Sequence, residues 1–130
     1  MFDATPLLID AGFPMTPQPG PVREGYHTAI PGIVVIEAAA AITFYEKAFG
    51  ATVRNRMHGP DGKSILHSEL VIGDSTIFIS DEGPGMAVRS PESLQGTTSS
   101  VHRSVENADA SFQRAVDAGV KPVMPPTDML

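Results

Sequence analysis

Twice along this chain, a short segment with the apolar pattern of a strand is followed by a stretch with the apolar spacing of a helix. Residues 34–36 are continuously apolar and lead into an alanine-rich amphipathic stretch that stops at Gly50. Residues 101–105 alternate between apolar and polar side chains and lead into a second amphipathic stretch, which stops at Gly119. An extended segment followed by a period near 3.6 is typical of a strand followed by a helix. The pattern therefore predicts a strand–helix unit that occurs twice.

The first unit is predicted to be a complete β-α-β-β-β module that spans residues 26–80. Gly50 supplies the left-handed position that commonly ends a helix. Turn residues at 59–62 and 73–74 separate the strands that come after the helix. The apolar stripe of the helix consists of Ala41, Ile42, Tyr45, Ala48 and Phe49. The predicted strands are residues 27–36, 51–58, 63–72 and 75–80.

The second unit is predicted to be an incomplete module over residues 98–130. Residues 81–97 contain three glycines and two prolines and are predicted to link the modules. A strand over 98–105, a helix and a strand over 120–124 follow, and the last strands of a module are missing. Residues 1–25 contain five prolines and are interpreted as a Pro-rich arm. The fold class predicted is α+β, with paired βαβββ modules of which the second lacks its last strands.

Alternation along strand 63–72 assigns its side chains to two faces of the sheet. The face predicted to pack beneath the helix holds Leu66, Leu70 and Ile72. The opposite face holds His67 and Glu69. The same alternation places His102, in strand 98–105, on the face that its helix does not cover. These three polar residues are therefore predicted to line a pocket between the two modules.

The composition excludes several classes of function. The formal net charge is −6 and the nine basic residues are scattered, which disfavours binding to nucleic acid or to an anionic membrane. No apolar run approaches the ~20 residues that span a bilayer. The first residues lack the basic region of a signal peptide, so a cytoplasmic location is expected. The chain has no cysteine, which excludes disulfides, thiolate metal ligands and cysteine catalysis.

His67 and Glu69 form the pair of residues with the clearest chemical potential. Residues i and i+2 of a strand point the same way and can reach one ligand together. With His102 they could bind a divalent metal, or they could bind a polar substrate while Glu69 acts as a general base. Alternatively, they are polar residues on a solvated face, paired with each other or with Arg54 or Arg56. The sequence leaves these interpretations open.

Several segments, in their order and spacing, resemble one known family. They are Gly25-Tyr26-His27, residues 38–51, 57–63, 67–70, 72–75 and 90–94, and Met124-Pro125-Pro126-Thr127-Asp128-Met129. The chain resembles the vicinal oxygen chelate superfamily, which includes glyoxalase I, bleomycin-resistance proteins and extradiol dioxygenases. Within it, the chain is most similar to the PhnB-like branch. The resemblance implies the paired βαβββ fold and a small-molecule ligand in the cavity between the modules.

The resemblance also implies a divalent metal, such as Zn, Ni, Fe or Mn, in the members that use one. There each module gives one ligand from its first strand and one from its last. His102 matches the first-strand position of the second module. Ile33 and Phe78 stand at the two positions of the first module, and the fourth position falls in the missing strands. One of the four positions is therefore filled by a metal-ligating residue.

Two functions of different classes are compatible with these residues. One is a metal-assisted or base-assisted enzyme, of the lyase, isomerase or dioxygenase type, that acts on a small oxygenated molecule. The other is a non-catalytic protein that binds a small molecule of the antibiotic type. A third reading is a fragment without a complete site. An incomplete sheet leaves an unpaired edge and an apolar concave face, so we expect a homodimer.

Overall fold

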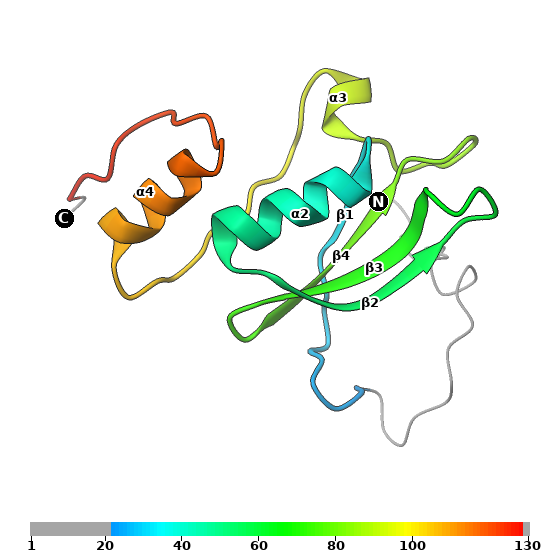
Figure 1. The fold of residues 1–130 in the computed structure, drawn as a ribbon, viewed down its shortest axis with the longest axis horizontal. Coiled ribbons are helices and arrows are strands. Elements are labelled where there is room, and N and C mark those ends of the chain that lie inside the picture. Colours follow the sequence, from blue (N-terminus) through cyan, green and yellow to red (C-terminus); the bar gives the residue numbers. More distant parts are fainter. Residues whose placement is uncertain (1–21, 129–130) are drawn as a thin grey trace.

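The computed structural model describes residues 22–128, which form a four-stranded sheet with a helix across one face (Figure 1). The strands are β1 (Gly32–Val35), β2 (Thr52–His58), β3 (Ile65–Ile72) and β4 (Ser75–Asp81), and the helix is α2 (Ala38–Phe49). Their order across the sheet is β1-β4-β3-β2. β1 is parallel to β4, and the other neighbours are antiparallel. The β-α-β-β-β order predicted for the first unit is confirmed.

The core lies between α2 and the sheet. Ile42 of α2 is fully buried and packs with Leu70 of β3 and with Ile77 and Ile79 of β4. Helical spacing brings the apolar stripe of α2 onto the sheet, and strand alternation brings these β3 and β4 residues to the same face. Gly50 ends α2 with φ of 70°, a left-handed conformation that glycine adopts without strain.

Asp81 fixes the start of α2 from the end of β4. The residue before the helix, Glu37, has φ of 61° and its side chain does not cap the helix. Instead the Ala38 N–H donates to Asp81 Oδ1 at 2.7 Å, and the Ile65 N–H donates to Asp81 Oδ2 at 2.7 Å. One carboxylate therefore satisfies an N–H group of the first helical turn and another at the start of β3. It joins three elements of the module.

The prediction that Leu66 packs beneath the helix is wrong. The ladder between β2 and β3 shifts between the pairs Met57–His67 and His58–Ile65, which leaves Leu66 as an extra residue on β3. Leu66 is 48% exposed, whereas Ile65 is fully buried in the core. A bulge of one residue reverses the alternation beyond it, so Ile65 takes the core position assigned to its neighbour.

The second half of the described chain contains α3 (Pro91–Leu94) and α4 (Ala108–Asp117). α4 lies beside the C-terminal end of α2 (Figure 1). Arg114 Nε donates to the Lys47 carbonyl at 2.9 Å, and Arg103 Nη2 donates to the Phe49 carbonyl at 3.4 Å. Two guanidinium groups thus meet the carbonyl end of α2, where the helix dipole favours positive charge. None of the helices in residues 22–128 has the length and hydrophobicity needed to cross a membrane.

The strands predicted over residues 98–105 and 120–124 are wrong, because neither segment is a strand in the structure. The strand predicted over residues 27–36 is confined to Gly32–Val35. A strand needs a neighbour for its backbone hydrogen bonds. Within residues 22–128 no strand pairs with 98–105, and that segment is exposed to water. The alternation of its side chains therefore does not become a sheet.

Candidate functional site

His67 and Glu69 lie side by side on the face of the sheet opposite α2. Glu69 pairs with Phe78 of β4, while the adjoining pair, Leu70 and Ile77, belongs to the core. Adjacent pairs point to opposite faces, so the carboxylate is on the side that α2 does not cover. Glu69 is only 4% exposed and His67 only 9%. The prediction that the two share this face is confirmed. Of the alternative, the pairing of His67 with Glu69 is confirmed, whereas the solvated face is not, because both side chains are buried.

The buried carboxylate of Glu69 is held by three partners. The Tyr26 hydroxyl donates to Oε1. His67 Nε2 lies 3.2 Å from Oε2, and the Arg23 guanidinium lies 3.9 Å from the same oxygen. The His67 ring donates to this oxygen in the tautomer that carries its proton on Nε2. Both oxygens of Glu69 are thereby engaged, which offsets the cost of burying a charged group.

Tyr26 connects this carboxylate to two arginines. The Arg23 guanidinium carbon lies 4.0 Å from the centre of the Tyr26 ring, and that of Arg54 lies 4.7 Å from it. Arg54 Nη1 also donates to Thr76 Oγ1 at 3.3 Å, which ties the arginine to β4. A guanidinium over an aromatic face is attractive, and more so where water is excluded. The tyrosine ring therefore contacts both guanidinium groups while its hydroxyl donates to Glu69.

His67 also borders an aromatic side chain, that of Phe78. The rings of His67 and Phe78 meet edge to face, with centroids 4.6 Å apart and an angle of 73°. Such contacts fix the orientation of an imidazole ring. The uncovered face thus offers a hydrogen-bond acceptor and an imidazole beside an aromatic ring, a combination suited to a small molecule with hydroxyl or carbonyl oxygens.

His102 does not join this pair as predicted. It lies in the segment 98–105, which forms no strand, and its Nε2 is 3.3 Å from the Ser100 hydroxyl. Among residues 22–128, no group of three or more His, Asp or Glu side chains is placed to hold a metal ion. At Glu69 a cationic side chain, Arg23, already lies 3.9 Å from Oε2. The side chains present therefore do not fit the metal site predicted from His67, Glu69 and His102.

Sequence reasoning missed Tyr26 and Arg23 as parts of the site. Arg23 falls in the segment interpreted as a Pro-rich arm, and its neighbours carry no periodic pattern. Tyr26 did leave a signal, because Gly25-Tyr26-His27 is one of the segments that carries the family resemblance. Arg54 was considered as a partner of the pair, and it reaches the site through the Tyr26 ring.

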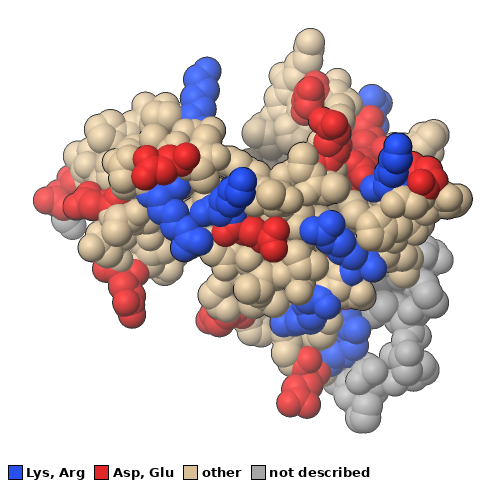
Figure 2. All heavy atoms as spheres, in the orientation of Figure 1, with Lys and Arg blue, Asp and Glu red and all other residues tan. Residues whose placement is uncertain are grey.

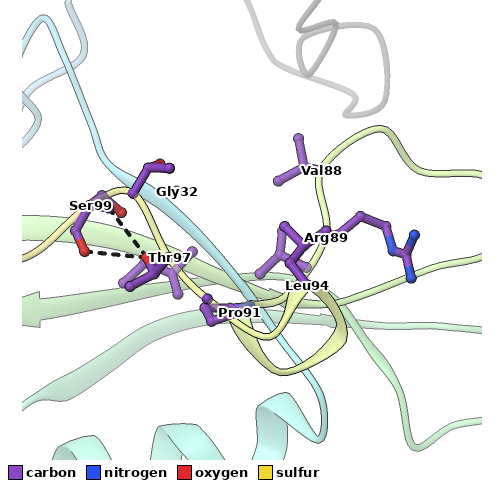
Figure 3. A pocket seen from close by; sticks show the side chains of 11 residues that line it. Gly32, Val88, Arg89, Pro91, Leu94, Thr97 and Ser99 are labelled. Carbon is purple, nitrogen blue, oxygen red and sulfur yellow. Dashed lines mark hydrogen bonds between the residues drawn. The ribbon is translucent and has the colours of Figure 1, made fainter.

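Apart from this face, a hollow of about 550 Å³ runs along the outer edge of β1 (Figure 3). Its walls are β1, α3 and the segments beside α3, and the labelled lining residues are Gly32, Val88, Arg89, Pro91, Leu94, Thr97 and Ser99. Thr97 and Ser99 hydrogen-bond to each other rather than into the hollow, and the Arg89 side chain points away from it. The hollow is mostly apolar and presents no catalytic group.

Glu82 fixes the wall of this hollow. It accepts hydrogen bonds from the Ser90 N–H at 2.7 Å, the Ser93 hydroxyl at 3.1 Å and Arg89 Nε at 3.1 Å. These donors, the Ser90 N–H first, lower the pKa of Glu82 from 4.5 to about 2.

Elsewhere on the surface, Figure 2 shows acidic and basic side chains interspersed over the face that carries α2.

Comparison with known proteins identifies close sequence relatives in mycobacteria. The chain is 43% identical over 103 residues to the uncharacterized protein Mb0911c of Mycobacterium bovis, covering 77% of this chain and 67% of that protein. It is equally identical over 103 residues to the uncharacterized protein Rv0887c of Mycobacterium tuberculosis, with 77% and 60% covered. The chain thus spans about two thirds or less of the length of these relatives.

Two solved structures share the fold. The gene product At5g48480 of Arabidopsis thaliana superimposes with a TM-score of 0.63 at 25% identity, covering 78% of this chain and 80% of that one. TioX from Micromonospora sp. ML1 superimposes with a TM-score of 0.54 at 20% identity, covering 78% and 77%. The model of the Glyoxalase/Bleomycin resistance protein/Dioxygenase superfamily matches residues 26–130. The chain therefore belongs to the glyoxalase/bleomycin resistance protein/dioxygenase superfamily.

Proposed function

We propose that this chain binds a small oxygenated molecule on the uncovered face of its sheet, through His67 and Glu69. The observation that carries the proposal is a carboxylate only 4% exposed on the face of the sheet opposite the core. Its other neighbours on this face of β3 and β4, apart from His67, are Phe78, Thr76 and Val71, none of which is ionisable. Proteins depart from apolar patterning chiefly where function requires it.

The chemistry of the pair suits a ligand with a hydroxyl group. Glu69 accepts a hydrogen bond from the Tyr26 hydroxyl, and a ligand hydroxyl would present the same donor to the same oxygen. The His67 ring, held by Glu69 and Phe78, would contact the ligand beside that hydroxyl. No step of this binding requires a metal ion.

The contacts of Glu69 favour ligand binding without a chemical reaction. A general base needs a free lone pair directed at the proton that it removes. Both carboxylate oxygens of Glu69 already accept hydrogen bonds or face a cation. Base-assisted turnover, with Glu69 as the base, is the second candidate, favoured by the burial of the carboxylate beside an imidazole.

Further parts of the proposal concern the assembly and the branch of the family. We propose a homodimer in which a second copy covers the exposed apolar side chains of the second half, such as Val101 and Met124, which are 66% and 58% exposed. A PhnB-like relationship and a cytoplasmic location stay predictions from the sequence. The molar mass in solution, measured by light scattering, decides between the homodimer and a monomer.

The ligand proposal is tested by calorimetric titration with one probe for each activity in the family name. The probes are the glutathione hemithioacetal of methylglyoxal, bleomycin and catechol. We expect one of them to bind, and Glu69→Gln to weaken that affinity roughly ten- to a hundredfold, because a hydrogen bond to a charged group is lost. Consumption of the bound probe, followed in the same samples, separates turnover from binding.

Glu106→Gln is the matched control, because Glu106 is an exposed carboxylate on the segment before α4. It should bind the probe as the unmodified protein does. Equal affinity of Glu69→Gln and Glu106→Gln would contradict the assignment of the site. Failure of all three probes to bind would contradict the ligand class.

A further inference from the structure

Residues 22–31, here called the strap, precede β1 and place the side chains of Tyr26 and Arg23 against Glu69 on the uncovered face of the sheet. The strap contains no helix or strand, and most of its residues are exposed. It joins the sheet where the Phe78 N–H donates to the Pro31 carbonyl at 3.0 Å. Its blue trace in Figure 1 leads into β1. Through these two side chains the strap contacts the buried carboxylate of the His67–Glu69 pair.

The attachment of the strap to the pair is concentrated in a single turn. The Tyr26 hydroxyl donates to Glu69, and Arg23 adds an ion pair at 3.9 Å to the same carboxylate. The Tyr26 N–H donates to the Arg23 carbonyl at 3.0 Å, so both side chains belong to one tight turn. Gly25, inside that turn, has φ of +85°, a conformation that favours glycine.

We propose that the strap is a lid, and that Tyr26 is its latch. The latch donates to the carboxylate that a ligand hydroxyl needs, so the closed lid and the bound ligand compete for Glu69. A segment held by few buried contacts opens locally at low free energy, far below that of global unfolding. Opening exposes His67 and Glu69 together, while the sheet and α2 stay folded.

The ligand part of this inference rests on the proposed function, but the lid itself does not. Opening is therefore tested without any ligand, by the rate at which diethyl pyrocarbonate modifies each histidine. His67 is nearly buried, whereas His58 and His102 are exposed and serve as internal references. Mass spectrometry of peptides gives the three rates from one sample.

The lid predicts slow modification of His67 in the unmodified protein and faster modification in latch variants. Tyr26→Phe keeps the ring between the arginines and removes only the donor, so the His67 rate should rise roughly ten- to a hundredfold. Tyr26→Ala should raise it further, and the rates at His58 and His102 should stay unchanged. Tyr45→Phe, a tyrosine on α2 outside the strap, is the matched control and should leave the His67 rate unchanged.

Two results would overturn the lid. One is an unchanged His67 rate in both Tyr26 variants, which would make the strap a fixed part of the fold. The other is a rate in the unmodified protein equal to that of His102, which would mean that the strap does not cover the pair. Hydrogen exchange of the unmodified protein gives a readout that needs no variant. Strap amides should exchange at least about tenfold faster than β3 amides if the lid opens locally, and equal rates would contradict the proposal.

A binding titration with the hemithioacetal, bleomycin and catechol then distinguishes the failure of the lid from the failure of the proposed function. If both hold, the probe that binds the unmodified protein binds Tyr26→Phe more tightly, because a larger fraction of molecules is competent to bind. A faster His67 rate without binding of any of the three probes would support the lid and contradict the proposed ligand class. Tighter binding without a change in the His67 rate would contradict the lid.

Discussion

Replacement of Asp81 by alanine should destabilise the whole module, because one carboxylate joins α2, β3 and β4. The side chain accepts from the Ala38 and Ile65 N–H groups, each at 2.7 Å. Asp81 is half-buried, so each charge-assisted bond should contribute about 1 kcal/mol or slightly more, near the lower end of the usual range. Loss of a helix N-cap adds a similar amount, part of which is the Ala38 bond already counted. The expected loss in the free energy of unfolding is about 2–3 kcal/mol.

The assay is urea denaturation followed by far-ultraviolet circular dichroism. For a small domain this loss corresponds to a midpoint about 1–2 M lower in urea. Asp81→Asn should fall between Asp81→Ala and the unmodified protein, since the amide keeps one acceptor but turns its N–H groups toward a donor. Asp128→Ala, an exposed carboxylate near the end of the described chain, is the control. A loss below about 0.5 kcal/mol for Asp81→Ala, within the range of ordinary surface substitutions, would refute the reasoning.

Three further predictions follow from local contacts. The pKa of Glu82 is lowered to about 2, so its carboxylate should stabilise the fold above pH 4.5, and this stability should be lost as the pH falls from about 4.5 to about 2. Glu82→Gln should have a lower unfolding midpoint than the unmodified protein at pH 7 and the same midpoint near pH 2. A difference in midpoint that stays constant from pH 7 to pH 2 would contradict the stabilising role of the ionised Glu82 carboxylate. Gly50→Ala should cost about 1 kcal/mol in thermal unfolding, because φ is +70° and the new methyl would meet Arg114 at 3.3 Å; an unchanged midpoint would contradict it. Arg114→Met should speed hydrogen exchange in α4 more than in β3, because it removes the 2.9 Å bond to the α2 carbonyl end; equal changes in both would contradict a local role in docking.

The first half of the chain could be predicted from its sequence because local and tertiary signals agree there. Helical spacing, Gly50 and the turn residues each point to the elements that form. The exception is Leu66, since a bulge depends on the pairing of two strands and leaves no mark in the alternation of one. The second half shows the limit of periodicity. Residues 98–105 alternate as a strand does, but within the described chain no neighbour supplies their hydrogen bonds.

The residues of the candidate site also differ in how far the sequence could predict them. His67 and Glu69 were predictable because i and i+2 on one strand share a face whatever the rest of the fold does. The position of His102 required a second strand to form, and that strand is not present. Tyr26 reaches Glu69 across 43 residues of sequence, from a segment without periodicity. Contacts of this kind depend on how the strap crosses the sheet, and no single-segment pattern encodes them.

The face of the sheet that carries Glu69 is the proposed ligand site. Its most direct test is a nuclear magnetic resonance titration of the ¹⁵N-labelled protein with the three probes named above. The amide shifts caused by a bound probe should be largest in the strap, in residues 67–71 of β3 and in residues 76–78 of β4. Shifts confined to residues 88–99, which line the hollow beside β1, would contradict it and place the ligand at the other site.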